Sequence, residues 1–349
     1  MTDISVIMPT AREKYSILGQ PHLNYLEPTM KSLARQTFKD FEFILVDALY
    51  DERKEDFSKL PFPIKHVPVH PNHRFWLDRK RWSVCASLNT ALLHSEGELL
   101  VRIDDASQFD EGFLERFWEG YQSGVWPLAM HTRYRGGKQA YYTEEYKQGG
   151  YEFTRVKAHG EPSDTEKNLN RVFKEGDPVR DTRWSVVERA GGRMIAPVDW
   201  MYGYSSFTLE AALKVNGFDE LFDESKSLED VDFGSRLEMA GGGGKFLLDV
   251  NHTVIEHEHE PIPESLIERD VKPIKCNYAV YLLNRRKRRW RANSDSLSEE
   301  DLRFIREVSL RPPCSPHPDF YDGGCEGEMW SLWVENQPFF NLREEMLSI

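Results

Sequence analysis

The sequence lacks the cysteine patterns of metal-binding and disulfide-rich proteins. Its 349 residues contain only four cysteines, Cys85, Cys276, Cys314 and Cys325, and none of them forms a C-x-x-C pair. Scattered cysteines favour free thiols in a reducing cytosol. The alternative, a zinc site that includes Cys314, His317 and Cys325, has no evident fourth ligand.

Long apolar runs and an overall basic charge are also missing. No stretch approaches the ~20 apolar residues of a membrane-spanning helix, so no transmembrane segment is expected. Strand-like sequence begins at Ile4, which leaves no room for a signal peptide and predicts a cytoplasmic protein. The formal net charge of −13 argues against a general nucleic-acid binder, because such affinity comes from basic surface.

One segment departs from this acidic average. Residues 271–291 contain eight basic side chains and no acidic one, so the rest of the chain carries −13 − 8 = −21. We expect a basic helix here, which either contacts an anionic molecule or is a solvated surface.

Apolar runs and amphipathic stretches alternate in the first third of the chain. The runs at 4–10, 41–47 and 97–103 predict buried strands, and the stretches at 26–38 and 83–97 predict helices between them. This order predicts an α/β protein with a parallel, Rossmann-like sheet. Residues 126–199 are expected to be loop-rich, and two helices and a strand follow within 208–260.

Polar side chains stand where the predicted strands end. Thr10 and Asp47 end the first two strands, and Asp104 and Asp105 follow the third. Ligands of open parallel sheets bind beyond these ends, and carboxylates there can hold a divalent cation that bridges a diphosphate. The alternative is that the two aspartates cap a turn or the next helix.

Three sequence blocks carry a resemblance to a known family. At "SLARQTFKDFEFILVD", "SLNTALLHSEGELLVRIDD" and "GFDELFDESKSLEDVDFGSRLEMAG" the chain resembles the family 2 glycosyltransferases of the GT-A fold. The resemblance implies a catalytic domain at 1–260, with a nucleotide-binding half at 1–109 and an acceptor-binding half at 110–260. Residues 261–349 would form a C-terminal extension with a basic helix and an aromatic tail.

The resemblance also implies a substrate and a cofactor. The family uses a nucleotide-diphospho-sugar, here most simply a UDP-sugar, and an Asp-x-Asp motif with Mn²⁺ or Mg²⁺. Thr10, Asp47 and Asn89 match positions that contact the nucleotide-sugar, and Asp104 matches the first aspartate of the motif. The second aspartate is replaced by Ala106, so either Asp105 becomes the ligand or metal binding is altered.

A later acidic pair matches the family's catalytic base. In "SLEDVDFG", Asp230 takes the position of the base, with Glu229 beside it and Asp232 as a further alternative. Ser227 and Asp230 also have the spacing of a helix capping box, a structural role that can coexist with catalysis.

The third predicted metal ligand is a histidine in "TVIEHEHE". The strand period of two puts His257 and His259 on one face, and the resembling family often places a histidine here, for which we take His257 rather than His259. Two plain surface histidines are the alternative.

The residues predicted to bind the acceptor are aromatic and basic. Trp200 and Tyr202 precede the "GFDE" block and can stack on a sugar, and Arg286 and Arg289 can contact an anionic acceptor such as a glycan, a lipid phosphate or a modified nucleic acid. We expect a metal-dependent, inverting glycosyltransferase. A nucleotide-sugar-binding protein without catalysis and a nucleotidyltransferase of related fold are the alternatives.

Overall fold

The computed structural model describes the chain in thirteen stretches. They are residues 2–11, 26–48, 50–51, 60–73, 83–134, 141–148, 151–158, 178–181, 183–223, 228–241, 244–256, 274–310 and 337–349.

Four parallel strands form one half of a large sheet, in the order β3-β2-β1-β4. They are β1 (Ile4–Thr10), β2 (Phe41–Asp47), β3 (Ile64–Val67) and β4 (Leu99–Arg102). β1 is apolar almost throughout because both of its faces are covered: Ile7 packs into one core, while Val6 and Met8 pack into the other. The parallel α/β sheet predicted from the sequence is confirmed.

The sheet continues past β4 with antiparallel and mixed strands. They are β11 (Ser205–Thr208), β6 (Val125–Tyr134), β12 (Lys245–Glu256) and β10 (Arg193–Ile195). Two short strands, β5 (Ser107–Gln108) and β9 (Pro178–Arg180), pair with β12 and β6. A separate hairpin joins β7 (Tyr141–Gln148) to β8 (Tyr151–Ala158).

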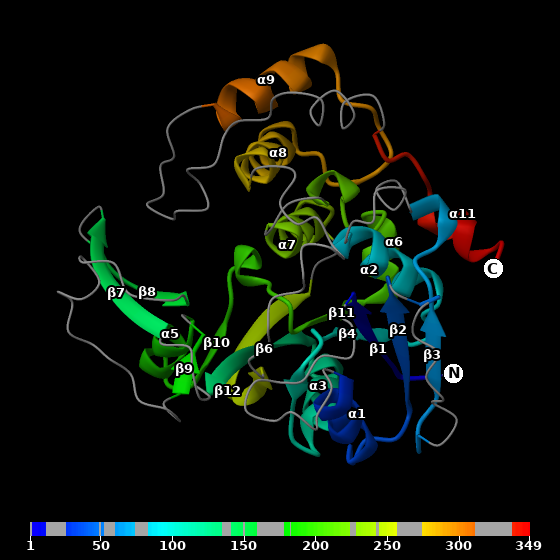
Figure 1. Ribbon diagram of the computed structural model, residues 1–349, viewed down its shortest axis with the longest axis vertical. Helices are drawn as coiled ribbons and strands as arrows, with labels where there is room; N and C mark the ends of the chain where they lie inside the picture. Colours follow the sequence, from blue (N-terminus) through cyan, green and yellow to red (C-terminus); the bar gives the residue numbers. More distant parts are fainter. Residues whose placement is uncertain are drawn as a thin grey trace.

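Helices cover both faces of the sheet (Figure 1). On one face lie α1 (Leu26–Ala34) and α3 (Phe113–Gln122), and on the other lie α2 (Val84–Leu93), α6 (Leu209–Lys214) and α7 (Glu229–Met239). Each set packs into its own hydrophobic cluster. Local chemistry sets the bounds of α6: the Thr208 hydroxyl accepts a hydrogen bond from Ala211 N, and Asn216 and Gly217 end the segment with positive φ.

The remaining helices are short or belong to the C-terminal part. They are η1 (Pro71–His73), α5 (Trp184–Arg189), η3 (Val198–Trp200), η4 (Glu220–Phe222), α8 (Ile274–Lys287), α9 (Glu299–Ser309) and α11 (Leu342–Met346). α8 and α9 stack outward from α7 (Figure 1). Leu342 is fully buried in the same cluster as α2 and α7, so the described part of the extension shares the core of the catalytic part.

The expectation of a loop-rich segment at 126–199 is wrong. β6 crosses this region as a ten-residue strand beside β12, and the β7–β8 hairpin, α5 and β10 follow. Pro127 and the preceding Gly124 interrupt the apolar pattern of β6. Trp126, Leu128 and Met130 are nevertheless buried in one hydrophobic cluster and Ala129 in the other, because the strand is covered on both faces.

The cysteines differ in part from the expectation of free thiols. Cys85 is free and buried, but Cys276 forms a disulfide with a partner outside the described residues. The expectation of a cytoplasmic protein is therefore no longer supported by free thiols at all four cysteines. Across the parts of the chain that the structure describes, no helix is long and apolar enough to cross a membrane.

Candidate active site

The carboxyl ends of β1, β2 and β4 bring the predicted strand-end residues together. Thr10 and Asp47 are register partners, and the Thr10 hydroxyl donates a hydrogen bond to Asp105 Oδ2 at 3.0 Å. Asp47 is buried, and its Oδ2 lies 3.0 Å from His66 Nε2. The carboxyl edge of these parallel strands is therefore polar, which is the edge where ligands bind in open α/β sheets.

Asp104 and Asp105 turn toward different partners. Asp105 faces Thr10, whereas Asp104 Oδ1 lies 3.9 Å from Arg102 Nη2. Ala106 is buried in a left-handed conformation with φ 57°, which bends the chain at the position of the missing second aspartate. Whether Asp105 replaces that aspartate as a metal ligand stays a prediction.

The Asp104 carboxyl has an unusual pKa. The pKa is raised to about 6, chiefly by burial and also by the carboxylates of Glu256, Asp105 and Glu229, while the charge of Arg102 lowers it. Water screens part of the shift, because 37 % of the Asp104 side chain is exposed.

The chemistry of these donors fits a hard divalent cation. Carboxylate oxygens are the ligands that Mn²⁺ and Mg²⁺ prefer, and Asp104, Asp105 and Glu256 all act electrostatically on this edge. Within the described part of the chain, no group of three or more His, Cys, Asp or Glu side chains is already arranged to hold a metal ion. His257 follows Glu256 directly but lies outside the described residues. The complete ligand set therefore stays a prediction.

Asp230 lies in the first turn of α7, close to Asp104 and Glu229. The helix begins at Glu229 with Leu228 as its N-cap, and the Leu228 carbonyl accepts a hydrogen bond from Asp232 N. The predicted capping-box register is wrong, because Asp230 is one position too early and its Oδ1 accepts from Val231 N at 2.8 Å. Leu228 has φ 78°, a strained conformation of the kind that clusters at functional sites.

The Asp230 carboxyl has a raised pKa. Its side chain is buried, and this burial together with the neighbouring Glu229 raises its pKa to about 7, against the opposing charge of Arg102. A base with a pKa near neutrality is suited to general-base catalysis. The alternative residue, Asp232, is engaged elsewhere: it forms a buried ion pair with Arg236 at 2.6 Å and accepts from Asn284 Nδ2.

Arg102 is a site residue that the sequence reading missed. It is buried on β4, and its Nη2 lies 3.3 Å from Glu229 Oε1. Its Nε and Nη1 are buried without a hydrogen-bond partner in the structure. Burial works against the guanidinium charge, but Asp104, Glu229 and Asp230 outweigh it and raise its pKa. The available signal was one arginine inside an apolar strand, since a buried charge requires a counter-charge.

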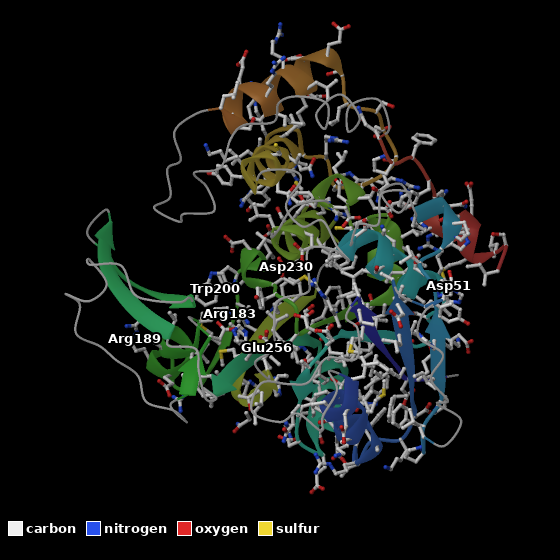
Figure 2. All side chains as sticks on the ribbon, in the orientation of Figure 1. Asp51, Arg183, Arg189, Trp200, Asp230 and Glu256 are labelled. Atoms are coloured by element: carbon white, nitrogen blue, oxygen red, sulfur yellow. The ribbon has the colours of Figure 1, made fainter. Side chains whose placement is uncertain are left out.

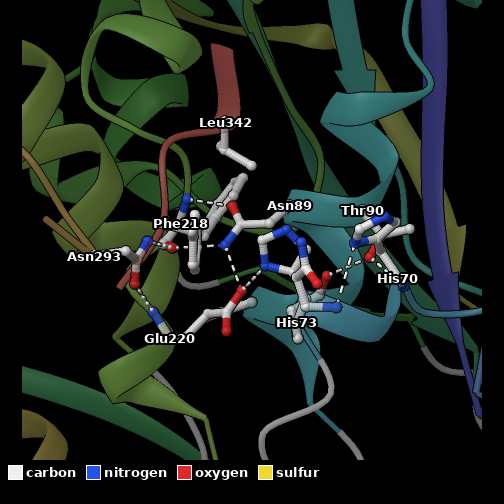
Figure 3. A network of polar contacts seen from close by, with 12 residues as sticks. His70, His73, Asn89, Thr90, Phe218, Glu220, Asn293 and Leu342 are labelled. Atoms are coloured by element: carbon white, nitrogen blue, oxygen red, sulfur yellow. Dashed lines mark hydrogen bonds and ion pairs between the residues drawn. The ribbon is translucent and has the colours of Figure 1, made fainter. Parts of the chain in front are cut away.

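Asn89 belongs to a different network, which we call the latch: His73, Asn89, Glu220, Asn293 and Glu345. Figure 3 shows its first four members. Asn89 is fully buried; its Nδ2 donates to Phe218 O and Glu220 Oε1, and its Oδ1 accepts from Phe218 N. These bonds hold α2 against the segment that precedes η4. Contact between Asn89 and a nucleotide stays a prediction beside this structural role.

The predicted acceptor residues fall in two places. Trp200 is the last residue of η3, and Tyr202 lies between η3 and β11. Figure 2 shows Trp200 beside Arg183, whose Nη1 donates to Trp200 O. The basic residues have other neighbours: Arg286 packs over the Phe304 ring of α9, and Arg289 bonds Asn284 Oδ1. Their contact with an anionic acceptor stays a prediction.

Comparison with known proteins identifies the family. The family model described as "Glycosyl transferase family 2" matches residues 5–180, half of the chain. No curated protein sequence matches the chain.

Several solved structures are similar at a distance. S. aureus TarS residues 1–349 is 16% identical, with a TM-score of 0.44 over 88% of this chain and 71% of that chain. The same TarS fragment in complex with UDP gives 15% identity and a TM-score of 0.41 over 88% and 71% of the two chains. The complex of that fragment with UDP-GlcNAc is 16% identical, with a TM-score of 0.43 over 91% of this chain and 78% of that chain. These likenesses are too distant to carry an argument about this chain.

The identity therefore rests on the family match. The chain belongs to glycosyl transferase family 2 and is a glycosyltransferase.

Proposed function

We propose that the protein transfers a sugar from a nucleotide-diphosphate donor, in the first instance a UDP-sugar, to an acceptor hydroxyl with inversion at the anomeric carbon. The observation that carries the proposal is the buried Asp230 carboxyl, whose pKa is raised to about 7. It lies in the first turn of α7, within electrostatic reach of Asp104 and Arg102.

In the proposed mechanism, the strand ends of the sheet bind the donor. Thr10 and Asp47 would contact the nucleoside, since both end parallel strands of the nucleotide-binding half. A Mn²⁺ or Mg²⁺ ion held by Asp104, Asp105 and His257 would supply charge neutralisation to the leaving diphosphate.

Asp230 then acts on the acceptor. Its carboxylate takes the proton of the acceptor hydroxyl while that oxygen attacks the anomeric carbon from the side opposite the diphosphate. The bond between the anomeric carbon and the diphosphate oxygen breaks, and its electron pair leaves with the nucleotide. General-base catalysis of this kind contributes about 10²–10⁴ in rate. Glu229, held by Arg102 at 3.3 Å, keeps the pKa of its neighbour Asp230 high by charge repulsion.

A screen of nucleotide sugars tests the proposal. With Mn²⁺ present, we expect the protein to release nucleoside diphosphate slowly from its cognate donor by hydrolysis, and the Asp104→Asn variant to lose most of this activity. Turnover of no nucleotide sugar, together with no binding of UDP, GDP or CDP, would overturn it.

The alternative of nucleotidyl transfer is distinguished in the same assay. That chemistry releases pyrophosphate from a nucleoside triphosphate, whereas glycosyl transfer does not. Pyrophosphate release that depends on Asp104 would replace the proposed reaction with nucleotidyl transfer on the same fold.

A further inference from the structure

Arg102 joins the end of β4 to the start of α7. One of its nitrogens, Nη2, lies 3.3 Å from Glu229 Oε1 in the first turn of α7 and 3.9 Å from Asp104 Oδ1 after β4. The side chain of Arg102 is only 4% exposed, and that of Glu229 is 15% exposed. Because a buried charge is tolerated only beside counter-charges, Arg102 and these carboxylates depend on one another.

The Arg102 guanidinium also packs on the aromatic core beneath α7. Its central carbon, Cζ, lies 5.8 Å from the centroid of the Phe218 ring. That ring stacks on Phe233 of α7, with centroids 4.1 Å apart and an interplanar angle of 13°. Phe233 lies three residues after Asp230 on the same helix. An ion pair and an aromatic stack therefore hold Arg102 against the helix that carries Asp230.

The remaining nitrogens of Arg102 do not face solvent. Nε and Nη1 are buried and have no hydrogen-bond partner among the described residues. A ligand that enters the site from solvent does not contact these two atoms in this arrangement. Arg102 therefore acts on the site through the carboxylates beside it, not by binding a substrate.

The first turn of α7 has little support from its own cap. The N-cap residue, Leu228, forms no side-chain hydrogen bond and has φ 78°, a strained conformation for leucine. Glu229 is the next residue along the chain. The ion pair between Arg102 and Glu229 therefore fixes the helix start at the point where capping does not.

Two opposite charges act on the Asp230 carboxyl in addition to its burial. Burial raises the pKa of Asp230, Glu229 raises it too, and Arg102 opposes both. Asp104 adds a smaller increase. The state of Asp230 at neutral pH therefore depends on a balance between Glu229 and Arg102.

Charges on the other elements packed against α7 are screened or paired. Asp199 of η3 and Arg285 of α8 are exposed, so water screens them. Asp232 of α7 itself forms a buried ion pair with Arg236. These groups leave the balance at Asp230 to the two residues that already touch each other.

We propose that Arg102 and Glu229 are the positioning residues of the base. Arg102 fixes Glu229 and the first turn of α7 at the end of β4, and its charge leaves Asp230 free to accept a proton from the acceptor hydroxyl. An arginine suits this place because its planar fork can face two carboxylates at once. The inference rests on the proposed glycosyl transfer, in which Asp230 is the base.

NMR of protein labelled with ¹³C at its aspartate carboxyl groups tests this role directly. The Asp230 resonance is assigned by its loss in Asp230→Asn, and EDTA keeps divalent cations away from Asp104. In the parent protein the resonance should titrate with a midpoint at about pH 7. In Arg102→Gln the midpoint should rise by about one to three pH units, the usual effect of removing an opposite charge beside a carboxyl.

Glu229→Gln tests the other half of the pair and keeps the inference falsifiable if Arg102→Gln does not fold. Glutamine can still accept a hydrogen bond from Arg102 but carries no charge, so the Asp230 midpoint should fall below that of the parent. The matched control is Arg180→Gln, which breaks an exposed ion pair with Glu188 at 3.2 Å and should leave the midpoint unchanged.

Turnover of the UDP-sugar that the nucleotide-sugar screen selects gives a second readout. The acid limb of kcat against pH should move with the midpoint. Arg102→Gln should therefore lose about tenfold in kcat at pH 7 for each pH unit of the change, and should recover at higher pH. A variant that is merely less stable would show no such recovery.

An Asp230 midpoint that is unchanged in Arg102→Gln, or unchanged in Glu229→Gln, would overturn the inference. The midpoint is measured without substrate, so it is independent of the proposed function. If the parent turns over no nucleotide sugar but the midpoints move as expected, the proposed function fails and the control of Asp230 by this pair stands. If a sugar is turned over and the midpoints do not move, the positioning role fails alone.

Discussion

Two buried polar clusters of this protein are built in opposite ways. In the latch, both ring nitrogens of the fully buried His73 meet carboxylates, Nδ1 with Glu220 at 2.7 Å and Nε2 with Glu345 at 2.9 Å. None of its five side chains has a buried polar atom without a partner. The cluster around Arg102, by contrast, has three carboxyl groups, Asp104, Glu229 and Asp230, for one guanidinium. Two nitrogen atoms of this guanidinium, Nε and Nη1, have no hydrogen-bond partner in the structure.

The difference indicates that the latch stabilises the fold, whereas the cluster around Arg102 serves the reaction. A fully satisfied buried network contributes to stability and fixes one arrangement of the chain, whereas unmatched buried charge costs stability and shifts pKa values. The pKa of His73 is raised to about 9, because its two carboxylate partners outweigh its burial. We therefore expect changes in the latch to alter folding, and changes around Arg102 to alter catalysis.

The largest expected effect is on catalysis, in Asp230→Asn. Asparagine has the same shape and can still accept the bond from Val231 N, but it cannot take a proton. We expect turnover of the sugar donor to fall by about 10²–10⁴. The melting temperature should be unchanged or higher, because a buried carboxyl with a raised pKa destabilises the fold near neutral pH.

The matched control for Asp230→Asn is Asp199→Asn, which neutralises an exposed carboxylate on the neighbouring η3 and should have no effect. Donor turnover in Asp230→Asn within a few-fold of the parent would transfer the role of base to Glu229.

The second prediction concerns the latch. Asn89→Ala removes three buried hydrogen bonds to Phe218 and Glu220, so we expect a loss of about 3 kcal/mol in the free energy of unfolding. Urea denaturation measures this loss. Asn72→Ala, which removes one exposed bond to Glu345, should cost less than about 1 kcal/mol. If Asn89→Ala kept its stability but lost UDP affinity, Asn89 would instead be a nucleotide-binding residue.

The third prediction is a pH dependence that originates in the latch. The folded pKa of His73 is about 9 and its ordinary value is 6.5, so its stabilisation is complete below pH 6.5 and is lost as the pH rises through 9. The difference corresponds to about 3 kcal/mol. The pKa values of the neighbouring Glu345 and His70 are both lowered, so these two groups titrate below the range between pH 6.5 and 9 in which His73 titrates.

Chemical denaturation between pH 6.5 and 9.5 checks this dependence. The free energy of unfolding should fall across the range in the parent protein and stay nearly flat in His73→Gln. Equal slopes in the two proteins would show that another group controls the dependence.

The smallest expected effect is on nucleotide affinity. If Asp104 and Asp105 hold a divalent cation, UDP should bind about tenfold more tightly with Mn²⁺ or Mg²⁺ than with EDTA, because carboxylates alone repel a diphosphate. Asp105→Ala should weaken binding at least as much as Asp104→Ala if Asp105 replaces the missing aspartate. Calorimetry that gave equal affinities with and without EDTA would contradict the metal site.

The sequence predicted those parts of the fold and site whose signals are local. Apolar runs located β1, β2 and β4, and strand ends located Thr10, Asp47 and Asp104, because chain direction alone places them at one edge of a parallel sheet. The parts that depend on contacts distant in sequence were not found. Arg102 and Glu229 are 127 residues apart, and Arg183 supports an aromatic segment through side-chain geometry that no periodicity encodes.

Asn89 illustrates the same limit in a residue that was found. The resemblance identified the position, but only the packed structure gives its three partners around Phe218. β6 was missed for a related reason: its apolar residues are interrupted by a proline, and burial against β12 outweighs the local signal.

The distance of the latch partners along the chain has a consequence for biosynthesis. His73 and Glu345 are 272 residues apart, so this contact forms only after residue 345 has been translated. At a synthesis rate of about 5–20 residues per second, roughly 15 to 55 s pass between the synthesis of His73 and that of Glu345, its second carboxylate partner. During that interval α2 and η1 lack the cover of Leu342 and Phe340, and the apolar surface around His73 is open to chaperones.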